Sequence, residues 1–409
     1  MATETDTCHR AKAVTTDDSD HSADPESTKP NNAHNSTTLS AGVAYPELDG
    51  TDLSLARKHP YVVGLTAIAT RHEPHQPFGL AYVTDYTKYL KITAVIRPSC
   101  NRGAQVVVVN DDMVAKIYDP LFYDSCDDSV FGEDVVTKAH CDYSYEAAAY
   151  QELQKSPAAQ ELIPAFYGTW TIDIDTLKRE GDQLCKYTRQ VPVLLIEYVR
   201  GFTMTDLDPR MLNEQMRTSV VKKALEADSI IYDAGVNHGD MHPRNIVIVG
   251  FRSDLEDGAP KEAIIKVIDF NVAHVRFHPM NKDLEIERII QKEREGWFPK
   301  LPSPLLRFYH SLDGFVWEGW CPNDDPDSDH EGSSLWLWNQ FKDDDRYIPV
   351  IWDRTNPWKS PRYVELENTS HDNSNLGTKI DGNDDVKVHG EDGIDIEMGE
   401  TEEGVWDDW

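Results

Sequence analysis

Residues 238–245 read HGDMHPRN and combine a carboxylate with an amide side chain five residues later. Phosphoryl transfer to a hydroxyl requires a carboxylate near the acceptor and, a few residues on, an amide oxygen that holds Mg²⁺. We therefore predict that Asp240 is the catalytic base and that Asn245 is a catalytic residue and a metal ligand. The alternative is a structural Asx-type turn, in which Asp240 is solvated and Asn245 caps the turn.

A second carboxylate, Asp269, follows 29 residues after Asp240, in the segment VIDFN at residues 267–271. It lies at the end of an apolar run that is typical of a buried strand. An aspartate that leaves such a strand is well placed to bind the metal ion that bridges nucleotide phosphates. We therefore predict that Asp269 binds Mg²⁺ together with the nucleotide.

A lysine lies in the middle of the apolar segment VAKIY at residues 114–118. Burying its ammonium group is costly unless the group meets an anion or a carboxylate. We predict that Lys116 contacts the nucleotide phosphates on one side and Glu146 of a following helix on the other. Glu152 is the alternative helix partner, and a lysine on an edge strand that points to solvent is the alternative to the whole arrangement.

A longer apolar run at residues 193–199 ends at Gly201 and precedes the loop that contains Asp240. Apolar neighbours can enclose a purine ring, while main-chain groups bind its polar edge. The segment resembles the strand and hinge that join the two lobes of a bilobal enzyme, and this resemblance implies that the backbone groups of Glu197 and Val199 meet the adenine edge. By itself the segment is only a hydrophobic strand that ends in a turn. The interpretation depends on its position between the predicted helix at 145–155 and the loop that contains Asp240.

Local periodicity and composition indicate the elements that position these residues. Short Val- and Ile-rich runs predict strands, and longer runs of Ala, Glu, Gln and Leu predict helices. We expect strands over residues 92–96, 105–110, 113–118, 191–198, 246–249 and 263–268, and helices over residues 145–155, 212–234 and 283–295.

Together these segments resemble the protein-kinase-like superfamily over roughly residues 90–300. The patterns HGDxHPxN and IDFN are more similar to aminoglycoside phosphotransferases and choline kinases than to typical Ser/Thr kinases, which carry HRDLKxxN. The stretches VAKIYDPLFYD, YEAAAYQEL and HGDMHPRN also resemble uncharacterised fungal proteins of the protein-kinase-like type.

The resemblance implies an α+β, bilobal protein-kinase-like fold over residues 59–360. It would have a small β-rich N-lobe at about residues 59–199 and a helical C-lobe at about 200–360. ATP and Mg²⁺ are the implied cofactors, and the implied reaction moves the γ-phosphoryl group to an alcohol. Lys116, oriented by Glu146, would hold the α- and β-phosphates.

The chain departs from this family at three places. Residues 97–104 contain one glycine where a GxGxxG loop would cover the phosphates, and there is no Ala-Pro-Glu segment to dock a peptide. Asn271 stands where the family usually has glycine, and asparagine tolerates a left-handed backbone better than most residues. The acceptor, a small molecule or a protein, is left open. The main alternative is a pseudokinase scaffold that binds nucleotide or partners without turnover; a purely structural acidic protein would leave these polar residues unexplained.

The charge of the chain is strongly negative and unevenly distributed. The 409 residues carry 40 Lys or Arg against 72 Asp or Glu, a formal net charge of −32. Such a surface repels phosphate backbones, which argues against a nucleic-acid partner. Residues 1–58 and 361–409 are polar, and we expect both tails to be disordered. The end of the second tail, VWDDW, is either an undirected acidic tail or a motif that docks a protein partner.

Nothing in the sequence indicates export or a membrane span. The first residues, MATETD, lack the basic and apolar parts of a signal peptide, and apolar runs such as residues 191–196 are far too short to cross a bilayer. None of the six cysteines has CxxC spacing, which favours reduced thiols. We therefore expect a soluble protein of the cytoplasm or nucleus without membrane contacts.

Overall fold

The computed structural model describes the chain in nine segments and divides it into two units. The first unit comprises residues 1–200 and 268–275, and the second comprises residues 201–267 and 276–409. The expected helix at 283–295, the insert at 251–261 and almost all of the two tails lie outside the described residues. The described residues are 59–74, 83–97, 103–123, 135–250, 264–276, 297–309, 312–322, 332–353 and 361–364.

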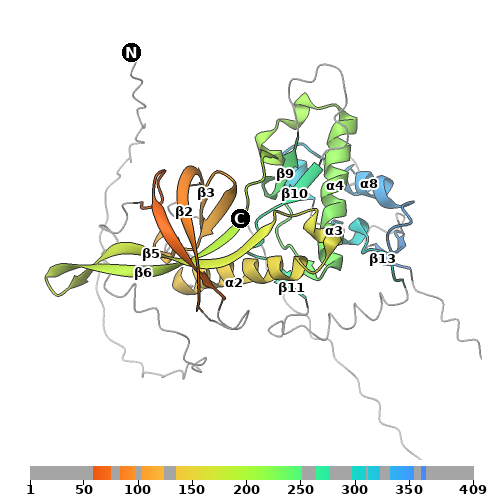
Figure 1. Cartoon of the computed structure of the whole chain (residues 1–409). Coiled ribbons are helices and arrows are strands. Elements are labelled where there is room, and N and C mark those ends of the chain that lie inside the picture. Colours follow the sequence, from red (N-terminus) through yellow and green to blue (C-terminus); the bar gives the residue numbers. More distant parts are fainter. Residues whose placement is uncertain are drawn as a thin grey trace, which may run out of the picture. The chain divides into compact units, whose positions relative to one another are not determined.

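Six strands of the first unit form a closed antiparallel barrel (Figure 1). The order around the barrel is β1-β2-β3-β4-β6-β5. Pairing of β1 with β5, for example Ala69 with Ile172, closes it. The strands are β1 Thr66–His72, β2 Val83–Arg97, β3 Gln105–Val109, β4 Met113–Ile117, β5 Phe166–Glu180 and β6 Gln183–Glu197.

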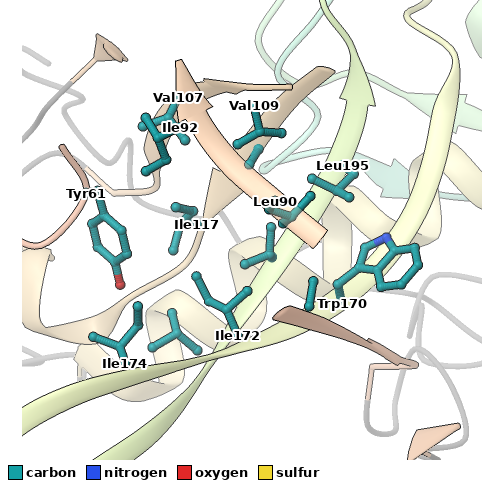
Figure 2. Close-up of a cluster of buried hydrophobic side chains, with 14 of the residues drawn as sticks. Tyr61, Leu90, Ile92, Val107, Val109, Ile117, Trp170, Ile172, Ile174 and Leu195 are labelled. Atoms are coloured by element: carbon teal, nitrogen blue, oxygen red, sulfur yellow. The ribbon is translucent and has the colours of Figure 1, made fainter. Parts of the chain in front are cut away.

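Alternating side chains from these strands fill the barrel. On β4, Ala115 and Ile117 are buried in this core, and on β6 Val193 and Leu195 join them. Figure 2 shows the side chains from several strands converging on the interior. This period of two places every other residue of a strand inside and sends its neighbours to the outer face. The position of Lys116 between Ala115 and Ile117 therefore assigns it to the outside of the barrel.

A long helix, α2 Val135–Leu153, lies against the outside of this barrel at β5 and β6. Its buried residues include Tyr143, Ala147 and Tyr150, spaced four and three positions apart, as expected for one face of a helix. The helix begins ten residues before the expected start at residue 145. It thereby carries Lys138 and Asp142 as well as Glu146.

The second unit contains another long helix, α4 Glu214–Asp233, and a three-stranded sheet. The Asn213 side chain caps α4 by accepting a 2.8 Å hydrogen bond from the backbone nitrogen of Met216. The sheet has the order β10-β9-β7, with β7 Gly201–Thr203, β9 Ile246–Val249 and β10 Ile264–Val267.

The remaining described elements are short. They are the helices α3 Pro157–Gln160, α6 Pro304–Arg307, α7 Asp313–Trp317 and α8 Gly332–Phe341, the 3₁₀ turns η1 Pro120–Phe122, η2 Met204–Asp206, η3 Pro209–Met211 and η4 Pro243–Asn245, and the two-residue strands β8 Val236–Asn237, β11 His274–Val275, β12 Val350–Ile351 and β13 Arg362–Tyr363. Among the helices that the structure describes, none combines the length and apolar character required to cross a membrane.

The expected α+β, bilobal protein-kinase-like fold is wrong. The strands of the first unit close into a barrel, and in the described part of the second unit only α4 and α8 are longer than five residues, which is not a helical C-lobe. Closure depends on β1 and on residues Trp170–Ile172 of β5, neither of which was expected as a strand. The β1–β5 pairing joins residues about a hundred positions apart, and local periodicity carries no information on such pairings.

Candidate active site

Lys116 lies on a strand that is paired along both sides. β4 lies between β3 and β6, and Lys116 is in register with Val106 and Leu194. Its side chain is only 6% exposed. The alternative of a solvent-facing lysine on an edge strand is therefore wrong for this residue. A buried ammonium group requires compensating negative charge.

Two carboxylates supply that charge. The Nζ atom of Lys116 donates hydrogen bonds to Oε2 of Glu146 and, over 2.5 Å, to Oδ1 of Asp269. The predicted ion pair with Glu146 is thus present. Glu152, the alternative partner, instead accepts a 2.6 Å hydrogen bond from Lys155. We call Lys116, Glu146 and Asp269 the ion cluster.

Glu146 is held from several directions, and its side chain is fully buried. Besides Lys116, the hydroxyl of Tyr118 donates to Oε2, and the backbone nitrogen of Phe270 donates to Oε1 over 3.3 Å. Tyr118 lies two residues after Lys116 and so faces the same side of the chain. These bonds give the carboxylate a fixed orientation toward Lys116.

The electrostatics of the ion cluster follow from its burial. Desolvation alone would lower the pKa of Lys116, but the charges of Asp269 and Glu146 outweigh it and raise the pKa. Desolvation, with the Glu146 charge, raises the pKa of Tyr118 well above its ordinary value. One ammonium therefore faces two carboxylates, and this excess of negative charge favours the arrival of another cation.

Asp269 has a left-handed backbone, with φ of 68°. Such a conformation is uncommon outside glycine and is frequent at functional sites. From the sequence, we expect Asn271 to tolerate a left-handed backbone. In the structure Asp269, not Asn271, adopts this conformation. Its neighbour Phe270 is fully buried and packs edge-on against Tyr150, with ring centroids 5.2 Å apart. This packing anchors the segment that presents Asp269.

A pocket of about 200 Å³ opens beside Lys116 and Asp269. Asp142 lies in its wall, one helical turn before Glu146, and accepts a 3.2 Å hydrogen bond from the hydroxyl of Tyr123. Burial raises the pKa of Asp142 to about 6, against the lowering effects of Tyr123, Lys116 and Asn271. The complete lining is Arg97, Gly103, Ala104, Lys116, Tyr118, Tyr123, Lys138, Asp142, Asp269 and Asn271.

The loop that contains Asp240 belongs to the second unit. Gly239, with φ of 77°, turns the chain in a left-handed conformation that glycine adopts without strain. The carboxylate of Asp240 accepts bonds of 2.7 and 2.9 Å from Nη2 of Arg244 and of 2.7 Å from Nδ2 of Asn245. The Asp240 side chain remains 31% exposed. The loop therefore presents an oriented carboxylate at the surface of this unit.

Asn245 is buried and ties the loop to itself. Its Nδ2 atom also donates to the carbonyl oxygen of Asp240 over 2.9 Å. The amide oxygen takes no part in these bonds, and amide and carboxylate oxygens are ligands that suit Mg²⁺. By donor type, Asn245 and Asp269 both fit this ion. Asn245 belongs to the second unit and Asp269 to the first.

His242 is fixed within the same loop. It caps η4, and its Nδ1 atom accepts a 3.3 Å hydrogen bond from the backbone nitrogen of Arg244. Burial, with the charge of Arg244, lowers its pKa, while Glu318, 3.7 Å from Nδ1, raises it. A Cβ atom on Gly314 would come within 2.4 Å of the imidazole ring. The ring therefore packs directly on the backbone of α7.

The predicted adenine contacts lie at the end of β6. The backbone nitrogen of Glu197 donates to the carbonyl of Ala165 over 2.8 Å, and its side chain accepts from the Ala165 nitrogen over 3.1 Å. Val199 follows two residues later and is half-buried. These two bonds fix the backbone of Glu197 against Ala165. A role for either residue in binding adenine stays a prediction.

Sequence reasoning missed several residues beside the predicted ones. Asp142 could have been found, because it lies four positions before Glu146 and hence on the same helical face. Tyr118 shares the strand face of Lys116. Arg244 lies within the segment HGDMHPRN, but no pattern in the sequence identifies it as the partner of Asp240.

No protein-family model matches the sequence, and no curated protein sequence matches it. The resemblance of residues 238–245 to phosphotransferase loops stays a prediction. The roles of these residues therefore rest on their geometry and chemistry.

Proposed function

We propose that this chain is an ATP- and Mg²⁺-dependent phosphotransferase that moves the γ-phosphoryl group to a hydroxyl acceptor. The observation that carries the proposal is the buried ion cluster, in which Lys116 pairs with Glu146 and Asp269 beside a pocket. A lysine held in this way is a preformed cation for phosphate oxygens. The left-handed backbone of Asp269 adds support, because such conformations are concentrated at functional sites.

Each residue has a distinct role in this proposal. Lys116 contacts the α- and β-phosphates, and Glu146 keeps its ammonium group in place. Asp269 of the first unit and Asn245 of the second unit are each proposed as an oxygen ligand of Mg²⁺, which when bound would neutralise part of the phosphate charge. The backbone groups of Glu197 and Val199 would meet the adenine edge.

The chemical step is a displacement at phosphorus. The acceptor hydroxyl gives its proton to the carboxylate of Asp240, and its oxygen forms a bond to the γ-phosphorus. The bond between this phosphorus and the oxygen shared with the β-phosphate breaks, and ADP leaves with the electron pair. Arg244 and Asn245, which bond to Asp240, orient its carboxylate for this proton transfer.

The acceptor is a small molecule or a protein, and the absence of an Ala-Pro-Glu segment favours the former. The strongly negative net charge of −32 favours a cationic acceptor over an anionic one. We place the activity in the cytoplasm or nucleus, where ATP is available and thiols remain reduced.

Thermal unfolding with ATP and Mg²⁺ tests the proposal. A ligand at 100 times its dissociation constant adds about 2.7 kcal/mol to the free energy of unfolding, which raises the Tm by several degrees. We expect this rise with ATP and Mg²⁺ together and a smaller rise with ATP alone. A rise that ignores Mg²⁺ would instead support a pseudokinase scaffold, and no rise in either condition would contradict the proposal.

A pair of matched variants ties the result to the site. Asp269→Asn should lose the Mg²⁺-dependent part of the Tm rise, because it removes the proposed carboxylate ligand. Asp175→Asn is the control, since Asp175 also pairs with a lysine but its side chain is 58% exposed. Equal Mg²⁺ dependence in the two variants would remove Asp269 from the metal site.

A further inference from the structure

Two cations besides Lys116 line the pocket of the first unit. Arg97 lies at the end of β2, and Lys138 lies in the first turns of α2. Both residues are exposed, and neither forms an ion pair or hydrogen bond with any residue in the described part of the chain. Their charges are therefore available to a ligand, and they add to that of Lys116, which already forms ion pairs with Glu146 and Asp269.

The size of the pocket limits what it can hold. Its volume of about 200 Å³ is below the roughly 300–1,000 Å³ that encloses a whole small-molecule ligand. A fragment such as a chain of phosphates fits this size better than a complete nucleotide. Arginine binds phosphate oxygens through its forked N–H groups, and lysine binds them as a point charge.

The pocket also contains opposing charges. Asp269 already pairs with Lys116, so Asp142 is the main carboxylate that an entering phosphate would meet. The hydroxyl of Tyr123 donates to its Oδ2 atom and screens part of this charge. Its pKa, raised to about 6 by burial, makes Asp142 easier to protonate than an ordinary aspartate.

We infer that Arg97 and Lys138 bind the polyphosphate chain of the nucleotide. This inference rests on the proposed function and names the groups that cover the phosphates. Phosphate-covering loops usually do so with the backbone amides of a glycine-rich turn. Here residues 97–104 contain a single glycine, and two cationic side chains supply the missing contacts. The contribution of Arg97 and Lys138 to nucleotide affinity should then depend on the number of phosphates and not on the base.

Binding of ATP and adenosine to three variants tests this inference. The variants are Arg97→Gln, Lys138→Gln and, as control, Lys91→Gln, an exposed lysine of β2 that does not line the pocket. Isothermal titration should show about tenfold weaker binding of MgATP to each pocket variant, since hydrogen bonds to charged groups contribute at this level. Adenosine should bind all four proteins equally, and Lys91→Gln should match the wild type.

Inorganic tripolyphosphate separates the failure of this inference from failure of the proposed function. If the wild type binds ATP and both pocket variants bind it equally well, the inference is overturned while the proposed function stands. The wild type could instead bind tripolyphosphate but no nucleotide, with Arg97→Gln and Lys138→Gln weakening the binding. That result would support the anion site and contradict the proposed nucleotide-dependent function. Absence of binding to both probes overturns both.

Discussion

The Nζ atom of Lys116 lies 2.5 Å from Oδ1 of Asp269, although 153 positions separate the two residues in the chain. Glu146, on α2, binds the same ammonium group. Three segments must therefore be in place before this one charge is compensated: β4, α2 and the residues that follow β10. The ion cluster is thus both a stabilising contact of the first unit and its candidate ligand site.

Replacing Lys116 by methionine should destabilise the protein by about 3–5 kcal/mol. The substitution leaves Glu146 buried without its counter-charge, and breaking a buried ion pair by removing one partner costs this much. Urea unfolding at pH 7, followed by circular dichroism, measures the change in the free energy of unfolding.

Lys155→Met is the matched control for this experiment. Lys155 also pairs with a glutamate, but its side chain is 70% exposed. An exposed pair contributes at most about 1 kcal/mol. Similar losses for Lys116→Met and Lys155→Met would show that the ion cluster contributes no more than a surface pair.

Asp142 should make stability depend on pH in the weakly acidic range. Burial raises its pKa from 3.8 to about 6 in the folded protein. The folded state therefore binds the proton more tightly than the unfolded state, and stability falls as the pH rises from about 4 through 6. Asp142→Asn removes this loss and should raise the free energy of unfolding by about 1–3 kcal/mol at pH 8.

Urea unfolding of the wild type and Asp142→Asn at pH 4.5, 6 and 8 measures this difference. The difference between the two proteins should be smallest at pH 4.5 and should grow toward pH 8, because the wild-type loss begins near the ordinary pKa of aspartate and is complete only above the raised one. Asp175→Asn, at an exposed aspartate of the β5–β6 hairpin, is the control and should show no such gain at pH 8. A gain for Asp142→Asn that is constant across the three pH values would show that its titration is not the cause.

Local sequence patterns predicted the elements that carry the candidate site. The strands β4, β9 and β10 and the helix α4 lie within two residues of the expected ranges. Each has a clear local signal, either a short Val- and Ile-rich run or a helical period. The pairing of Lys116 with Glu146 was also predictable, because a buried ammonium group has few other partners.

The closure of the barrel was not predictable in this way. The part of β5 that pairs with β1, Trp170–Ile172, lies in the segment TWTIDIDTLKRE at 169–180, where apolar residues are interrupted by polar and charged ones and no apolar run marks a strand. β1 reads TAIATRH, and only one of its seven residues, Ala69, is fully buried. Their structure comes from long-range pairing, and the same holds for the left-handed backbone of Asp269.

A second buried ion pair, between Arg189 of β6 and Asp119 just after β4, stabilises the first unit. Arg189 donates to both carboxylate oxygens of Asp119, over 2.7 and 2.8 Å, and the Tyr61 hydroxyl donates to Oδ2 over 2.6 Å. Arg189→Met should cost about 3–5 kcal/mol, because Asp119 stays buried without its counter-charge. Tyr61→Phe, which removes one hydrogen bond to a charged group, should cost about 1.5–3 kcal/mol.

Urea unfolding of these variants and of Arg189→Met combined with Asp119→Leu measures the pair. The double variant should be more stable than Arg189→Met alone, because it no longer buries an isolated charge. Equal stability of the two would show that Asp119 does not remain as an isolated buried charge when Arg189 is absent.

Asp240→Asn should abolish phosphoryl transfer while leaving the Tm rise with ATP and Mg²⁺ intact. The amide cannot accept the proton of the acceptor hydroxyl, so the chemical step is lost without loss of nucleotide binding. Release of ADP in the presence of a metabolite and peptide mixture measures the step. Asp208→Asn is the control, because Asp208 also pairs with an arginine, Arg210, but lies outside the loop. Unchanged turnover in Asp240→Asn would remove Asp240 from the role of base.

Gly314→Ala should disturb the loop that contains Asp240 through His242. A Cβ atom at position 314 would lie 2.4 Å from Cδ2 and 2.8 Å from Nε2 of the ring, so either the imidazole or α7 must move. Such overpacking costs about 1–3 kcal/mol, and the shifted ring would lose its 3.3 Å bond from the Arg244 backbone.

Because Arg244 also holds the Asp240 carboxylate, we expect Gly314→Ala to lower turnover by more than its loss of stability explains. Combining it with His242→Ala distinguishes the two effects. The smaller side chain at position 242 relieves the collision and should restore the free energy of unfolding toward that of His242→Ala alone. If the double variant shows the full sum of both losses, the ring does not transmit the strain, since independent sites add and coupled neighbours do not.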